Sequence, residues 1–268
     1  MRDTKPVATI RGARRIWAVG AVHGERGRLA ELHLRLDRQL APGDALIYLG
    51  DCLGYGGDVA GTVTELLDFR RRVLGRPPLR FPEHIVYLRG RQEEMWQKLL
   101  QLQFASDPQS VLNWVLARGV AATLEAYGGD VEDGLRSARA GPLALNKWTK
   151  RLREAVRAHP GHESLMAALR RAAVSDDGRL LFVNCGIDPA RDLDQQRDAF
   201  WWAARGFDSL EGPFAGFGRV VRGFDPTHRG CAETSYSVTV DGGCGFGGPL
   251  VAVCFDRDGR VLDRLECG

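Results

Sequence analysis

Residues 44–58, DALIYLGDCLGYGGD, join a short apolar run to a glycine-broken loop that is led by an aspartate. The five residues from Ala45 to Leu49 are too few for a helix, and an unbroken apolar run of this length is typical of a strand covered on both faces. Gly50 lets the backbone turn sharply, which leaves the carboxylate of Asp51 at the carboxyl end of the strand. Because open α/β sheets bind their ligands at that end, Asp51 marks the expected place of a metal or phosphate site.

Two other stretches repeat this order of strand, glycine loop and polar residue. They are residues 15–25, RIWAVGAVHGE, and residues 84–94, HIVYLRGRQEE. Helical patterns follow all three loops, with apolar residues recurring at helical spacing over residues 25–40, 58–75 and from 91 onward. Asp58 is the expected N-cap of the second helix, which we expect to end before a turn at Pro77-Pro78.

The second half of the chain changes from helical to strand-like patterns. Residues 107–173 have an almost continuous helical pattern, and residues 179–184, 220–221, 236–240, 250–255 and 261–265 are predicted to form short strands. We find no internal linker. The prediction is one domain over residues 1–268, α/β in class, with two packed mixed sheets, helices on both outer faces and a helical insert at about 107–173.

The order and spacing of the three loops resemble those of the metallophosphoesterases. Within that superfamily the chain is similar to the calcineurin-like phosphoprotein phosphatases and to the bacterial enzymes that cleave diadenosine tetraphosphate. Members carry D-x-H, then G-D-x-x-D-R-G, then G-N-H-E, and later two separate metal-ligand histidines. The resemblance covers nearly the whole chain and implies a four-layer αββα sandwich with a two-metal centre.

The metal-ligand positions of this family are only partly kept. At D-x-H the chain reads Ala21-Val22-His23, so the first carboxylate is absent. At the second motif Asp51 is kept, but the second aspartate and the arginine that grips phosphate are not. Residues 90–93 read GRQE in place of G-N-H-E. Two of the six ligand positions remain, His23 and Asp51, and four are changed: Ala21, Arg91, Asn184 and Phe224.

These changes predict a metallophosphoesterase scaffold with a degenerate metal centre, and neither a catalytic residue nor a cofactor is expected. A two-metal hydrolase needs about six ligands to hold its ions. The catalytic histidine corresponds to Gln92, which has no titratable proton near neutral pH. Arg91 places a permanent cation at a ligand position, and we expect it to form an ion pair with Asp51 because a buried unpaired carboxylate is costly.

Three functions follow from this site. The first is a catalytically inactive pseudophosphatase that binds a protein partner through the old active-site face or the helical insert. The second is a divergent metal-dependent phosphoric ester hydrolase, acting on phosphoproteins or nucleotides, in which His23, Asp51 and Asn184 hold a weakly bound Mn or Mg ion. The third is a sensor that binds a phosphorylated or nucleotide ligand without cleaving it, through Arg89, Arg91 and Arg222.

Composition narrows the partners and the compartment. The chain has 268 residues, of which 44% are hydrophobic and 26% charged, with a formal net charge of +3. The arginines are scattered, so nucleic-acid binding is not predicted. No apolar run of 18 residues predicts a membrane span, and the first residues lack the apolar centre of a signal peptide. Together with six isolated cysteines, this predicts a cytoplasmic protein.

Overall fold

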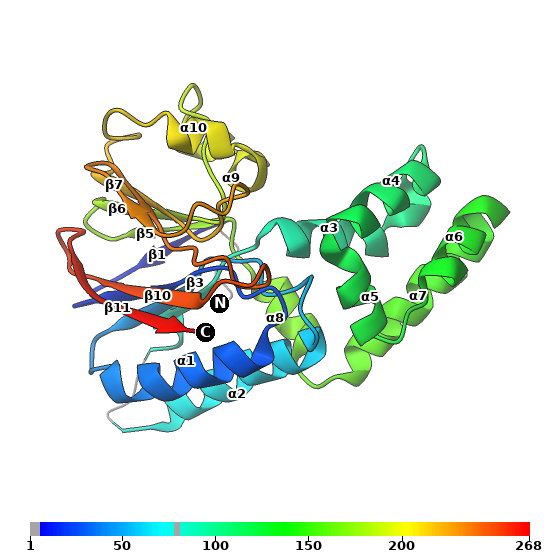
Figure 1. Ribbon diagram of the computed structural model, residues 1–268, viewed down its shortest axis with the longest axis horizontal. Coiled ribbons are helices and arrows are strands. Elements are labelled where there is room, and N and C mark those ends of the chain that lie inside the picture. The colour runs from blue at the N-terminus through cyan, green and yellow to red at the C-terminus, as the bar shows by residue number, and fades with distance from the viewer. Residues whose placement is uncertain (1–5, 78–80) are drawn as a thin grey trace.

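Two β-sheets face one another and carry helices on their outer sides in the computed structural model, which describes residues 6–77 and 81–268. Figure 1 shows helices α1 and α2 below the sheets and helices α9 and α10 above them. This arrangement confirms the predicted α/β four-layer αββα sandwich of two mixed sheets. Of the predicted Pro77-Pro78 turn, Pro78 lies outside the described residues.

The five-stranded sheet contains the apolar run that begins at Ala45. Its strand order is β11-β10-β2-β3-β4, in which β2, β3 and β4 are parallel and β10 and β11 are antiparallel to their neighbours. The strand bounds are β2 Ile16–Val19, β3 Ala45–Tyr48, β4 Ile85–Tyr87, β10 Leu250–Phe255 and β11 Val261–Cys267.

The six-stranded sheet has the order β1-β5-β6-β7-β9-β8. Strands β6, β7 and β9 are parallel to one another, as are β1 and β5, while β5 and β8 pair antiparallel with β6 and β9. The bounds are β1 Val7–Ile10, β5 Ala172–Ser175, β6 Leu180–Val183, β7 Arg219–Arg222, β8 Ala232–Glu233 and β9 Ser237–Thr239.

Strand β5 corrects one expectation, because the helical pattern was predicted to continue to residue 173. The alanine-rich run at residues 172–175 favours a helix by propensity alone. It forms a strand instead because it is buried between β1 and β6, where backbone pairing on both sides outweighs local preference. Its partner β1, at the start of the described chain, was not predicted either.

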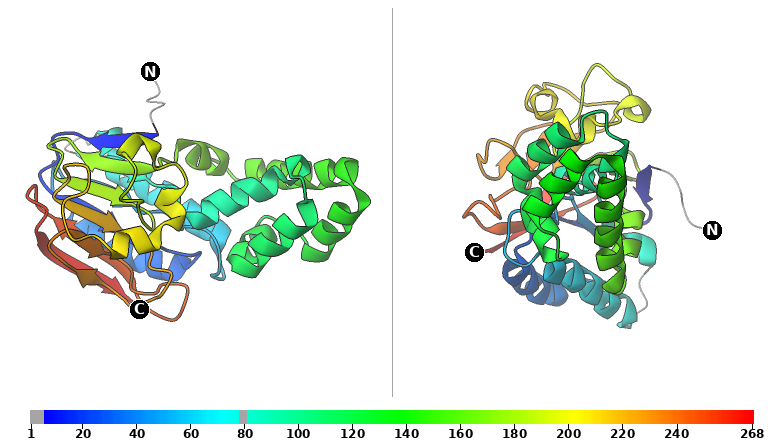
Figure 2. Two further views of the ribbon diagram at one scale, coloured as in Figure 1. Left: turned by 90° about the horizontal axis from the view of Figure 1, so that it is seen from above. Right: turned by 90° about the vertical axis from the view of Figure 1, so that its right-hand side faces the viewer.

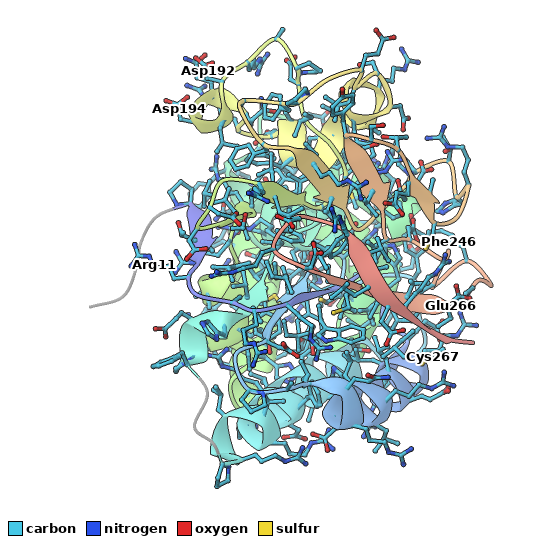
Figure 3. All side chains as sticks on the ribbon, turned by 90° about the vertical axis from the view of Figure 1, so that its left-hand side faces the viewer. Arg11, Asp192, Asp194, Phe246, Glu266 and Cys267 are labelled. Carbon is cyan, nitrogen blue, oxygen red and sulfur yellow. The ribbon has the colours of Figure 1, made fainter. Side chains whose placement is uncertain are left out.

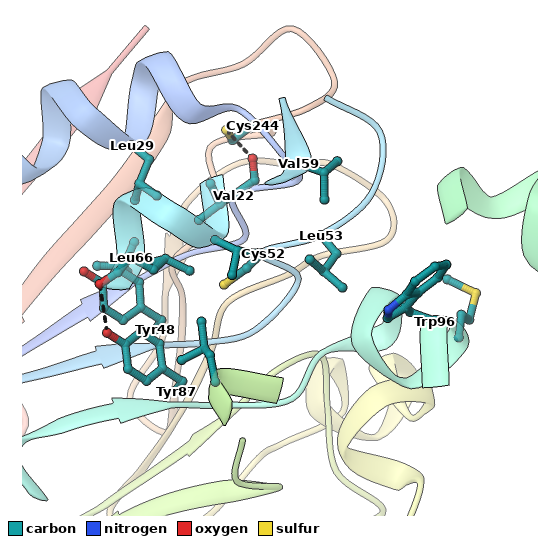
Figure 4. Close-up of a cluster of buried hydrophobic side chains, with 14 of the residues drawn as sticks. Val22, Leu29, Tyr48, Cys52, Leu53, Val59, Leu66, Tyr87, Trp96 and Cys244 are labelled. Atoms are coloured by element: carbon teal, nitrogen blue, oxygen red, sulfur yellow. Dashed lines mark hydrogen bonds between the residues drawn. The ribbon is translucent and has the colours of Figure 1, made fainter. Parts of the chain in front are cut away.

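Side chains of β3 alternate between two cores, as the period of a strand requires. Ala45 and Ile47 enter the core between the sheets, whereas Leu46 and Tyr48 face helices α1 (Arg26–Gln39) and α2 (Val59–Gly75). Figure 4 shows part of this helix-side core, in which the Tyr87 hydroxyl donates to the Leu66 carbonyl at 3.3 Å. Asp58 caps α2 as predicted, accepting from the Gly61 amide at 2.8 Å.

The remaining helices lie on the other outer face or, along the chain, between β4 and β5. Helices α9 (Ala199–Trp202) and α10 (Ala204–Asp208) cover the six-stranded sheet through Phe200, Trp201 and Phe207. Between β4 and β5 the helices are α3 Arg91–Leu100, α4 Pro108–Val115, α5 Ala121–Ala126, α6 Val131–Ala140, α7 Pro142–Ala158 and α8 His162–Ala168. Figure 2 shows helices α3 to α7 projecting from one end of the sandwich. The assignment of residues 1–268 to one domain stays a prediction.

Candidate functional site

Loops from both sheets meet where the parallel strands end. The His23 amide donates to the Asp51 carbonyl at 2.8 Å, which ties the loop after β2 to the loop after β3. The Ala21 amide donates to the Gly223 carbonyl at 2.9 Å, and the Gly223 amide donates to the Asn184 carbonyl at 2.9 Å. The bond from Ala21 to Gly223 crosses from the five-stranded to the six-stranded sheet, and the other two join neighbouring loops of one sheet each. Together they place most of the expected site residues at one end of the sandwich.

The Asp51 carboxylate is fully buried and accepts hydrogen bonds on both oxygens. Its Oδ1 accepts from the backbone N–H of Gln92 at 2.7 Å, and its Oδ2 accepts from Asn184 Nδ2 at 3.1 Å. Gly90 permits this approach, since a Cβ at that position would lie 2.4 Å from Asp51 Oδ1. The carboxylate therefore has protein partners on each oxygen.

His23 is 1% exposed and lies among three aromatic rings. The rings of Tyr55, Phe224 and Phe246 stand edge-on to the imidazole, with centroids 5.2 to 5.3 Å away. Among the described residues, none meets a ring nitrogen of His23 in hydrogen-bond geometry. Burial lowers the pKa of His23 below its usual value, although the nearby Asp51 charge acts in the opposite direction.

The expected ion pair between Arg91 and Asp51 is absent, which corrects the sequence argument. Among the described residues no salt bridge joins the two, and the Arg91 guanidinium lies 4.7 Å from the Trp202 ring centroid and 5.3 Å from that of Phe224. Asn184 and the Gln92 amide supply the partners of Asp51 instead. Because the carboxylate is already hydrogen-bonded, Arg91 is free to stack on aromatic rings.

The other two arginines expected to bind a ligand lie elsewhere. Arg89 pairs with Glu94 at 3.2 Å. Arg222 is 2% exposed, pairs with Asp208 at 3.1 Å and Asp225 at 3.2 Å, and stacks over Phe207. Both are held by neighbouring acidic groups, so of the three arginines only Arg91 faces the cavity at this end of the molecule.

A cavity of about 170 Å³ opens between the strand-end loops and the helical insert. Arg118 lines it beside Arg91, and the sequence argument missed this residue. Arg118 and Gly119 have non-helical backbone angles that interrupt the segment Leu116–Val120. The Arg118 carbonyl accepts from Gln92 Nε2 at 2.7 Å, so the insert is tied to the loop after β4. The glycine in this helical pattern was the available signal of a break.

Backbone strain gathers around the same cavity. Among the described residues, six other than glycine have positive φ angles, and four of them line the cavity: His23, Asp51, Tyr55 and His228. Such conformations persist only where the surrounding structure enforces them, and they cluster at functional sites. The strained backbone at this end of the sandwich is therefore typical of a functional site.

Comparison with known proteins identifies the scaffold. No protein-family model and no curated protein matches the chain. Among solved structures it is similar to a candidate diadenosine tetraphosphatase, with 20% identity, a TM-score of 0.56 and 98% of each chain covered. It is also similar to a protein serine/threonine phosphatase from Saccharomyces cerevisiae, with 12% identity, a TM-score of 0.56 and coverage of 98% of this chain and 83% of that one. The chain has the metallophosphoesterase fold. A cold-active protein-tyrosine phosphatase of a Shewanella species shares it at 14% identity and a TM-score of 0.55, with 98% and 84% covered.

The metallophosphoesterase fold implies divalent metals, and the side chains present do not fit a two-metal centre. Ala21 and Phe224 carry no donor atom, and Arg91 brings a positive charge. Within residues 6–77 and 81–268 no group of three or more His, Cys, Asp or Glu side chains could hold a metal. Asn184 also fits a single metal poorly, because its Nδ2 faces Asp51 and its Oδ1 accepts from the Arg91 amide at 3.3 Å.

Glu93 is a second residue that the sequence argument left without a role. Its buried carboxylate accepts from the amides of Gly90, Asp51 and Leu53 at 2.7 to 3.0 Å, which fixes the loops after β3 and β4 to each other. Desolvation, followed by the Asp51 charge, raises the pKa of Glu93 to about 7. The last letter of the G-x-x-E pattern at residues 90–93 was the sequence signal for it.

Proposed function

We propose that the chain is a catalytically inactive protein of the metallophosphoesterase fold, a pseudophosphatase that acts by binding a protein partner. The observation that carries the proposal is the double hydrogen bond at Asp51, whose two carboxylate oxygens accept from the Gln92 amide and from Asn184. A metal ion would need these same oxygens as ligands. The amide side chain of Gln92 supplies no general acid near neutral pH.

The face around the cavity supports a protein partner. Tyr55 and Phe246 are 40% and 41% exposed, and Figure 3 shows Phe246 at the edge of the molecule. Arg118 stacks over the exposed Trp114 with 4.7 Å between the guanidinium carbon and the ring centroid. Aromatic side chains and arginine are the residues most enriched at the energetic centres of protein interfaces.

A non-hydrolysing sensor of a phosphorylated or nucleotide ligand is the second candidate. The cavity favours it, because a concave site with an arginine in its wall suits an anionic small molecule. Of the three arginines expected to bind such a ligand, Arg89 and Arg222 are held by acidic neighbours outside the cavity.

The loss of catalysis is tested with the purified protein and an aryl phosphate or a diadenosine polyphosphate, in the presence of Mn, Mg or Zn. We expect no metal-dependent hydrolysis above background, and no bound metal by elemental analysis. A turnover of about 1 per second, at the low end for enzymes, that is abolished by a chelator and by Asp51→Asn would overturn the proposal in favour of the divergent hydrolase.

Partner binding is tested by comparing proteins captured from a lysate by the natural chain and by Phe246→Ala. We expect a captured protein to be lost with Phe246→Ala and kept with Phe81→Ala, which removes an aromatic ring that is 63% exposed and does not line the cavity. Equal capture by both variants would show that the cavity face is not the binding surface.

A further inference from the structure

We propose that the cavity binds a carboxylate, which an acidic side chain of the protein partner inserts between Arg91 and Arg118. This inference rests on the proposed function, since it names the chemistry that the partner presents to the old active-site face.

The arginine and aspartate side chains that line the cavity leave one positive charge in excess. Arg91 and Arg118 contribute two cations, and Asp51 contributes one anion. Within the described chain neither guanidinium forms an ion pair, since Arg91 stacks on Trp202 and Phe224 and Arg118 on Trp114. A carboxylate balances this excess, whereas a doubly charged phosphate leaves one negative charge unmatched. Charge complementarity in a partly buried site therefore selects a monoanion.

Acidic groups just outside the cavity do not change this balance. The Asp225 carboxylate pairs with Arg222 at 3.2 Å and with Arg229 at 3.0 Å. The Asp241 carboxylate accepts from the Asp225 amide at 2.7 Å and from the Gly243 amide at 2.8 Å. Neither residue lines the cavity, and each carboxylate is satisfied by its own neighbours.

Within the part of the chain that the structure describes, two buried side chains in the wall carry polar atoms without hydrogen-bond partners. Both ring nitrogens of His23 and the Oε1 of Gln92 are unpaired, although His23 is 1% exposed and Gln92 3%. Imidazole nitrogens act as donor or acceptor according to the tautomer, and an amide oxygen presents an acceptor. Buried polar atoms without partners are costly, so these groups point to a ligand that brings both an acceptor and a donor. An acidic residue within a peptide brings carboxylate oxygens and a backbone N–H.

The remaining wall suits the apolar stem of such a side chain. Tyr55, Phe224 and Phe246 place aromatic rings around the cavity. The volume of about 170 Å³ far exceeds the ~10–15 Å³ that one water needs, so the methylene groups of a glutamate can enter with its carboxylate. Exposed Tyr55 and Phe246 at the rim would contact the peptide on either side.

The test is calorimetric titration of the full chain with short blocked peptides at low ionic strength. We expect acetyl-Ala-Glu-Ala-amide to bind at least about tenfold more tightly than acetyl-Ala-Gln-Ala-amide. It should also bind more tightly than the same blocked peptide with phosphoserine in the central position. Arg91→Gln and Arg118→Gln should each remove most of the preference for glutamate. Arg139→Gln, a matched change at an exposed arginine of helix α6, should leave it unchanged.

Equal affinity for the two peptides, tighter binding of phosphoserine, or no binding of any peptide would each overturn the inference. Binding of free glutarate as tightly as the peptide would assign the site to a small carboxylic acid and refute the peptide source. These outcomes are separable from failure of the proposed function, because metal-dependent hydrolysis of phenyl phosphate is measured independently. An inactive protein with no glutamate preference refutes only this inference.

Discussion

Asn184 and Asp51 join the two sheets through a buried hydrogen bond, in which Asn184 Nδ2 donates to Asp51 Oδ2 over 3.1 Å. Asn184 follows strand β6 of the six-stranded sheet, and Asp51 follows strand β3 of the five-stranded sheet. The same Nδ2 also donates to the Leu49 carbonyl at 2.9 Å. Both residues are fully buried, so the amide gives the carboxylate a partner that water cannot supply. One side chain thus holds the strand ends of both sheets together.

We therefore expect Asn184→Ala to lower the free energy of unfolding by about 2 to 4 kcal/mol, because it leaves one oxygen of a buried carboxylate without a partner. Urea denaturation measures the loss. Asn113→Ala, at an exposed position of helix α4, is the matched control and should change stability by less than about 0.5 kcal/mol. Adding Asp51→Asn to Asn184→Ala should recover part of the loss, since the stranded charge is removed. Equal losses at positions 184 and 113 would contradict this account.

Arg91 and Asp51 should be energetically independent of each other. Arg91→Asn removes stacking on Trp202 and Phe224, so we expect a loss of about 1 kcal/mol. In a double-mutant cycle with Asp51→Asn the coupling energy should stay below about 0.5 kcal/mol. A coupling of more than about 1 kcal/mol would restore the ion pair that the sequence argument expected.

The scaffold could be predicted because its signals are local. The apolar run from Ala45 to Leu49, the turn at Gly50 and the helical pattern after Asp58 each depend on a few adjacent residues. Parallel strands bring their carboxyl ends to one edge, so the loops that carry His23, Asp51 and Arg91 had to lie near one another. The repeated strand-loop-helix pattern was therefore sufficient to predict the fold and the position of the site.

The direction of the side chains could not be predicted, because it depends on residues far apart in the chain. From the sequence, Arg91 could contact either Asp51 or another group. The ring of Trp202, which it does contact, belongs to helix α9 over the six-stranded sheet. Arg118 lies at the cavity because its carbonyl accepts from Gln92 Nε2, which ties the insert to the loop after β4. Asn184 was counted as a lost ligand, and its role as the partner of Asp51 required the geometry of two sheets.

Glu93 predicts a pH dependence of stability. Its folded pKa of about 7 lies above the ordinary value of 4.5, so between these values the folded state binds more protons than the unfolded state. Stability should therefore fall as pH rises from about 4.5 to about 7 and level off above that range. Denaturation at several pH values measures the slope.

The contribution of Glu93 must be separated from that of His162, which acts in the opposite direction. Burial lowers the pKa of His162 to about 4, so its contribution to stability is lost as pH falls from 6.5 toward 4. We therefore compare the natural chain with Glu93→Gln, which removes the Glu93 titration and leaves that of His162 in place. The difference in unfolding free energy should vary between pH 4.5 and 7. A difference that is constant across this range would mean that Glu93 stays ionised throughout.

The contact between Gly119 and Tyr55 should hold the helical insert against the strand-end loops. The Tyr55 amide donates to the Gly119 carbonyl at 3.3 Å, and a Cβ at position 119 would lie 2.6 Å from the Tyr55 ring. Gly119→Ala is therefore destabilised both by a positive φ of 93° and by a steric clash. Gly128→Ala, at φ 71° with open space around it, is destabilised by the backbone angle alone. We expect losses of about 2 to 4 kcal/mol for the first and about 1 kcal/mol for the second. Faster hydrogen exchange at the Tyr55 amide in Gly119→Ala alone would locate the effect. In a Tyr55→Ala background the clash is absent, so Gly119→Ala and Gly128→Ala should lower stability by similar amounts. A larger loss for Gly119→Ala in that background would show that the insert does not rest on the Tyr55 ring.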